Sequence, residues 1–177
     1  MAVWPFKKKE VSPTGPDLQD EALADLSRMF LNCPSDPTPG GDILQSSQFD
    51  FTVESLAAMD RHLEQMQTKK LSERDRFVFI LRSGAYVGEI IRRFTLPPKE
   101  WHWLAYKQAA SLIPYVASLG MSAETSAVLW DGKDGVIFPL AKVSKYLHNG
   151  AEDSVLFYVK VLIAGLPPRS TQNKKTI

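Results

Sequence analysis

Residues 73–94 have the sequence ERDRFVFILRSGAYVGEIIRRF, and this stretch decides the predicted fold. The preceding Ser72 and the acids that follow it are typical of a helix start, and Pro97 and Pro98 should end the helix soon after Phe94. At 100° per residue, one side of this helix is apolar and is expected to face a core. That side holds Phe77, Ile80, Leu81, Gly84, Gly88 and Ile91.

The opposite side of this helix carries a polar stripe, which consists of Arg82, Tyr86, Glu89 and Arg93. These residues fall within about 60° of one another in helical projection. We expect the stripe to face outward, where it is a candidate surface for a partner protein. Trp101 and Trp103 of the next segment either pack in the core, with one of them partly exposed, or extend this surface as exposed tryptophans. Charged pairs three or four residues apart on a helix are also common as solvated structural pairs, so a structural role stays open.

Two glycines on the apolar side, Gly84 and Gly88, require an explanation. Each costs the helix about 1 kcal/mol relative to alanine. Something must therefore approach the backbone closely at these positions. The predicted neighbour is a packed helix or sheet, and the alternative is a ligand or partner lying on the bare backbone.

The rest of the chain predicts an α+β fold, with helices packed on a small antiparallel sheet. The clearest part of the sheet is a hairpin near residues 125–138, in which Asp131–Gly135 forms the loop. A further strand is predicted over 101–106, followed by a helical turn over 108–112. A single helix over 99–112 is the alternative.

Four more helices are predicted, over residues 17–32, 52–68, 140–148 and 154–164. The last is the most apolar of them and is expected to lie at the centre of the fold, although its composition would also suit a strand. The predicted organisation has a flexible arm over 1–16, a helix with a Pro/Gly-rich loop over 17–48, one globular domain over 49–166, and a disordered basic tail over 167–177.

Composition excludes several function classes. The 21 basic and 20 acidic residues give a net charge of +1, which is not typical of nucleic-acid binding. The single cysteine, Cys33, allows no disulfide within the chain, and we expect a cytoplasmic protein. The histidines, His62, His102 and His148, have no metal-site spacing, and no phosphate-binding glycine motif occurs. No metal or cofactor is predicted.

Three functions are considered. The favoured one is a non-enzymatic protein-interaction or accessory domain of an immunity-like or regulatory kind, whose partner would be another protein. The alternative is a ligand-binding or hydrolytic enzyme with a cleft formed by Tyr86, Glu89 and Arg92. A third function is membrane attachment through Trp4 and Phe6, for which the three lysines at 7–9 are too few to give stable binding.

From residue 51 to about residue 166, the chain also resembles a family of small uncharacterised bacterial proteins. The residues that carry the resemblance are Val53-Glu54-Ser55-Leu56 with Asp60 and Leu63, Gly84 to Glu89 with Arg92, Trp101 to Tyr106, Phe138-Pro139-Leu140 with Lys142-Val143, and Asn149-Gly150 with Glu152 to Val155. The resemblance implies a bacterial cytosolic setting and a shared fold. It assigns no catalytic residue.

Overall fold

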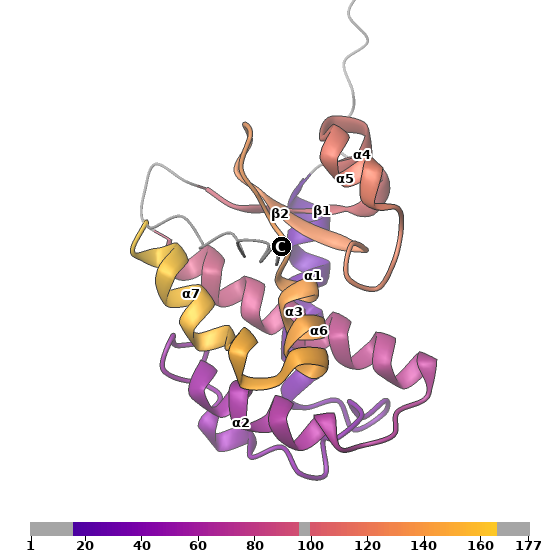
Figure 1. Cartoon of the computed structure of the whole chain (residues 1–177), viewed down its shortest axis with the longest axis vertical. Helices are drawn as coiled ribbons and strands as arrows, with labels where there is room; N and C mark the ends of the chain where they lie inside the picture. The colour runs from indigo at the N-terminus through magenta and orange to yellow at the C-terminus, as the bar shows by residue number, and fades with distance from the viewer. Residues whose placement is uncertain (1–15, 96–99, 166–177) are drawn as a thin grey trace, which may run out of the picture.

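A computed structural model describes residues 16–95 and 100–165 (Figure 1). The elements in these ranges are α1 (Pro16–Leu31), the short 3-10 helix η1 (Ser46–Gln48), α2 (Leu56–Gln67), α3 (Glu73–Phe94), β1 (His102–Ala105), α4 (Tyr106–Leu112), α5 (Pro114–Leu119), β2 (Ala127–Trp130), β3 (Val136–Ile137), α6 (Pro139–Asn149), η2 (Gly150–Asp153) and α7 (Val155–Ile163). The predicted α+β class is confirmed. The predicted N-terminal arm, C-terminal tail and Pro97-Pro98 helix stop lie outside the described residues.

The long helix α3 occupies the centre of the molecule, between α1 and α6 (Figure 1). Its predicted extent over 73–94 is confirmed. Ser72 begins it, because the Ser72 hydroxyl accepts a hydrogen bond from the Asp75 backbone N–H at 3.1 Å. Helices pack around α3 over most of its circumference, so its middle turns are buried on every side, including Ile80, Val87 and Ile90.

The two glycines of α3 admit two different neighbours. A Cβ atom built at Gly84 would lie 2.8 Å from the Leu140 Cα atom of α6. A Cβ atom at Gly88 would lie 2.1 Å from Cζ2 of the Trp103 indole. Both distances are shorter than any normal carbon–carbon contact, so the predicted packing of neighbouring elements on the bare helix backbone is confirmed.

Gly88→Ala is expected to lower the free energy of unfolding by about 1–3 kcal/mol, because the rigid indole cannot move away from the added methyl group. Urea denaturation of the purified protein measures this change. The matched background is Trp103→Phe, whose smaller ring leaves room at this site. Gly88→Ala should cost clearly less in that background, and equal costs in both backgrounds would contradict the contact.

The sheet has the strand order β1-β2-β3, with both pairs antiparallel. Its register places Trp103 opposite Leu129, and Leu129 opposite Ile137. The predicted hairpin loop is also observed, since the Asp131 carboxylate accepts hydrogen bonds from the Lys133 and Gly135 backbone N–H groups. The strand interpretation of residues 101–106 is thus correct, and α4 follows β1 directly.

The two faces of the sheet belong to two separate cores. Trp103, Leu129 and Ile137 face the large core that surrounds α3. The alternate residues face α4 and α5, and they form a small core with the buried side chains of those helices. The small core consists of Leu104, Ala109, Val116 and Val128. Figure 1 shows α4 and α5 on the side of the sheet that lies away from α3.

The apolar helix α7 does not lie at the centre, so that expectation is wrong. It packs against α2 and α3 at one side of the molecule, where only Val155 and Val159 are buried (Figure 1). Phe157 is 68% exposed. The physical reason is length: α7 has nine residues, whereas α3 has 22 and already fills the centre. The choice of helix over strand for this segment is correct.

The first helix shares the large core. Leu23 and Phe30 of α1 are buried in the same cluster as Leu63 and Phe79. The boundary expected near residue 49 therefore does not separate two cores. In the described parts of the chain, no helix is long and apolar enough to cross a membrane.

Candidate functional site

Three of the four residues of the polar stripe predicted on α3 are buried, so the expectation that the stripe faces outward is wrong except at Arg93. Arg82 is 3% exposed, and its guanidinium donates to the Asp36 backbone carbonyl at 2.7 Å and to the Thr38 hydroxyl at 3.2 Å. It also forms an ion pair with the Asp36 carboxylate. Arg82 thus holds the Pro/Gly-rich loop against α3, and the loop covers it.

Tyr86 is fully buried, one turn further along α3. Its hydroxyl shares a hydrogen bond of 2.7 Å with the Ser55 hydroxyl and accepts one of 3.0 Å from the Phe51 backbone N–H. The Ser55 hydroxyl donates its single proton to the Thr52 carbonyl, so Tyr86 is the donor to Ser55. Burial raises the pKa of Tyr86. The ring is neutral and structural.

The contact with Tyr86 also fixes an unusual backbone conformation at Phe51. Phe51 has a positive φ of 61°, in the left-handed region that non-glycine residues rarely adopt. The Phe51 backbone N–H donates a hydrogen bond to the Tyr86 hydroxyl, and the centroids of the two rings are 4.6 Å apart. The Arg93 guanidinium carbon lies 4.4 Å from the centroid of the Phe51 ring, over its face. Arg93 is the one exposed member of the stripe, and its guanidinium contacts the face of the Phe51 ring.

Glu89 belongs to a polar network that joins α1, α3 and β1. One Glu89 carboxylate oxygen accepts from the Arg92 guanidinium and from the Trp103 indole N–H, both at 2.9 Å. Arg92 also donates to the Asp20 carboxylate at 2.8 Å. His102 Nδ1 lies 3.0 Å from the same Asp20 oxygen. The second Asp20 oxygen accepts from the Trp103 backbone N–H at 2.6 Å.

This Asp20–Glu89–Arg92 network has the properties of a structural connection. Its carboxylates are nearly buried, and each of them accepts hydrogen bonds from two different residues or more. Burying charges is favourable only when they are paired and hydrogen-bonded in this way. Of the six residues of the predicted candidate surface, Arg93 is exposed and the other five are buried, so together they do not form an exposed surface. The buried five are Arg82, Tyr86, Glu89, Trp101 and Trp103.

The alternative cleft is not supported by the geometry either. The Tyr86 hydroxyl is bonded to Ser55 and Phe51, whereas Glu89 and Arg92 are bonded to Asp20 and Trp103. The three side chains proposed for one active site are therefore divided between two separate groups of partners. In the described ranges, no group of three or more His, Cys, Asp or Glu side chains could hold a metal ion.

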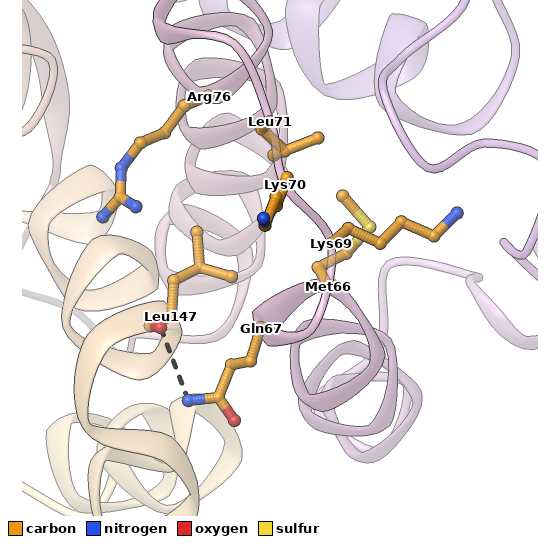
Figure 2. Close-up of a pocket in the computed structure, with 7 residues that line it drawn as sticks. All are labelled: Met66, Gln67, Lys69, Lys70, Leu71, Arg76 and Leu147. Carbon is orange, nitrogen blue, oxygen red and sulfur yellow. Dashed lines mark hydrogen bonds between the residues drawn. The ribbon is translucent and has the colours of Figure 1, made fainter.

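A hollow of about 410 Å³ lies elsewhere, between the turn from α2 to α3 and the end of α6 (Figure 2). It is lined by Met66, Gln67, Lys69, Lys70, Leu71, Arg76 and Leu147. None of these residues is acidic. The sequence shows the basic residues of the turn, but it does not show that Leu147, from a distant segment, completes the wall.

A second surface feature is the outer side of α4 and α5. Four large apolar side chains are exposed there: Leu112 by 51%, Tyr115 by 60%, Leu119 by 46% and Met121 by 73%. The ten residues from 112 to 121, LIPYVASLGM, contain no charged residue. This absence of charge is visible in the sequence, but only the structure shows that these side chains point away from both cores.

Comparison with known proteins finds no matching family model, no matching curated protein and no matching solved structure. The resemblance to a family of bacterial proteins and the cytoplasmic location therefore stay predictions.

Proposed function

We propose that the chain is a non-enzymatic interaction domain that binds another protein through α4 and α5. The observation that carries this proposal is the run of four exposed apolar side chains, Leu112, Tyr115, Leu119 and Met121, in a segment without charge. We name these four residues the α4–α5 surface. The four side chains lie within ten consecutive residues, and exposed apolar side chains that gather on one part of a folded domain are typical of interaction sites.

The composition of the α4–α5 surface also supports a protein partner. Aromatic residues and methionine are enriched at protein interfaces, while lysine and acidic residues are depleted. Tyr115 provides a large ring with few rotatable bonds, and it is supported from below by an edge contact with Phe138 at 6.1 Å between ring centroids. A surface of this kind fits the apolar, charge-poor side of a partner helix or loop.

The helices that carry this surface are held in place before any partner binds. Ala109 of α4 and Val116 of α5 are fully buried against Leu104 and Val128 of the sheet. The exposed side chains are therefore presented from a packed base, which reduces the entropy cost of binding.

Photo-crosslinking in cells tests the proposal. A photoreactive amino acid at position 115 should capture one defined partner protein. The same amino acid at position 157 is the matched control, because Phe157 is similarly exposed but lies on α7, on another side of the molecule. Capture from both positions alike, or from neither, would contradict the proposal.

The double variant Leu119→Asp/Met121→Asp is expected to weaken binding of the purified partner at least about tenfold, because it places two charges in an apolar interface. Isothermal titration calorimetry measures the change in Kd. Thermal stability should stay near that of the wild type, since both side chains are exposed, and Phe157→Asp should leave Kd unchanged. The captured protein could also be a second copy of this chain. Sedimentation velocity of the purified chain tests this case, because a dimer of the chain alone would show that the proposed partner of a different sequence is wrong.

A further inference from the structure

We propose that the hollow between α2, α3 and α6 binds a small molecule that carries a phosphate group beside an apolar part. This proposal is independent of the α4–α5 surface. The hollow measures about 410 Å³, which is within the size range of small-molecule sites. Its wall combines cationic and apolar side chains, and it contains no carboxylate that would repel an anion.

Two cations are available to a ligand, Lys70 and Arg76. Both side chains are exposed at the rim of the hollow, and among the described residues neither forms an ion pair within 4 Å. Figure 2 shows Lys69 directed to the opposite side, where its ammonium lies 3.2 Å from Asp42. Arginine can donate two parallel N–H groups to phosphate, and lysine adds a mobile point charge, so this pair suits a phosphate group.

The apolar part of the ligand would contact the floor of the hollow. Met66, Leu71 and Leu147 line it, and they come from α2, the connecting turn and α6. Gln67 connects two of these walls, because its side-chain amide donates to the backbone carbonyls of Tyr146 at 3.1 Å and Leu147 at 3.4 Å (Figure 2). The hollow is therefore formed before a ligand arrives, which favours binding.

One nearby carboxylate competes for Arg76. Glu124 is within electrostatic reach of the Arg76 guanidinium. Glu124 also accepts a hydrogen bond of 2.7 Å from the Ser144 hydroxyl, and a glutamine at this position could still accept that bond. Glu124→Gln thus removes the competing charge and keeps the local structure, and it should tighten phosphate binding.

An NMR titration at low ionic strength tests the two parts of the proposed ligand with three probes, which carry both parts, the phosphate group alone, or the apolar ring without phosphate. Phenyl phosphate should give saturable amide shifts confined to residues 66–76 and 145–150. Inorganic phosphate should give the same pattern with weaker affinity, and benzyl alcohol should bind most weakly. No saturable shift with phenyl phosphate would overturn the proposal. Equal affinity for phenyl phosphate and inorganic phosphate would overturn the apolar part of the ligand class.

The double variant Lys70→Gln/Arg76→Gln is expected to weaken phenyl phosphate binding at least about tenfold. The matched control is Lys107→Gln/Lys160→Gln, which removes the same total charge from exposed positions on α4 and α7. The control should keep wild-type affinity. Equal losses in both double variants would show non-specific attraction, and no loss in the first would show that Lys70 and Arg76 do not bind the phosphate group. Either result would overturn the site.

Discussion

Replacing Asp20 with alanine is expected to lower the free energy of unfolding by about 3–5 kcal/mol. Asp20 is the point where α1 meets both α3 and β1, because its carboxylate accepts from the Trp103 backbone N–H and the Arg92 guanidinium and lies 3.0 Å from His102 Nδ1. Without it, the buried Trp103 N–H loses its acceptor, and the Arg92 guanidinium keeps Glu89 but loses the second of its two carboxylate partners. Removing one partner of a buried, hydrogen-bonded charge pair is among the most costly single substitutions.

Chemical denaturation of Asp20→Ala measures this loss, and a carboxylate on the same helix provides the control. Asp25 pairs with Arg28, but both side chains are well exposed. Asp25→Ala should therefore change the free energy of unfolding by no more than about 1 kcal/mol. Asp20→Asn keeps an acceptor for the Trp103 N–H and should fall between the two. Similar small effects for Asp20→Ala and Asp25→Ala would mean that the network does not hold α1 in place.

Acidification is expected to destabilise the protein through His62. This histidine is buried on α2, and its ring contacts the rings of Phe30 and Phe79 at centroid distances of 6.0 and 5.7 Å. Within the described residues, its Nδ1 atom has no hydrogen-bond partner. Burial lowers the pKa of His62 from 6.5 to about 4. The imidazole is therefore neutral in the folded protein at neutral pH.

The sign of the pH effect follows from this pKa. Because the folded pKa lies below the unfolded one, the unfolded chain binds more protons between about pH 6.5 and pH 4. The contribution of neutral His62 to the free energy of unfolding is fully present above pH 6.5. It is lost as the pH falls to 4, and the total loss is about 3 kcal/mol. Other groups also titrate in this range, so the comparison must be made against a variant that differs only at this position.

Urea denaturation of wild type and His62→Phe at a series of pH values isolates the contribution of His62. Phenylalanine keeps an aromatic ring in contact with Phe30 and Phe79 and does not titrate. The difference in the free energy of unfolding between the two proteins should change by about 3 kcal/mol between pH 7 and pH 4, in favour of the variant at low pH. Should His62→Phe fail to fold, His62→Gln serves in the same comparison. Parallel stability curves would show that His62 is not protonated on unfolding.

Local signals predicted much of the secondary structure. The extent of α3 follows from its cap at Ser72 and its periodic side chains, and the hairpin follows from the Asp131–Gly135 loop. The orientation of α3 could not be predicted in the same way. The partner of Arg82 lies 46 residues away, at Asp36, and a helical projection cannot show that a distant loop covers a polar side. A prediction from the polarity of the side chains alone therefore placed Arg82 at the surface, although it is buried.

The candidate sites were missed for a related reason. Core packing of Trp103 was one of the two interpretations that the sequence allowed, and the structure shows how it occurs: the bare backbone of Gly88 admits the indole, and Glu89 accepts its N–H. The hollow and the α4–α5 surface depend on which segments leave their side chains uncovered, and this is a property of the assembled fold. The ten-residue run without charge was the one feature of the α4–α5 surface that the sequence displayed.

The division of the sheet between two cores has a consequence for how this protein can change over time. Leu104 and Val128 support α4 and α5, while their neighbours Trp103 and Leu129 support the rest of the molecule. Substitutions on α4 and α5 therefore act on the small core first, which is separated from the large core by the sheet. The outer side of α4 and α5 can therefore change its side chains among descendants of this chain while the core around α3 stays the same.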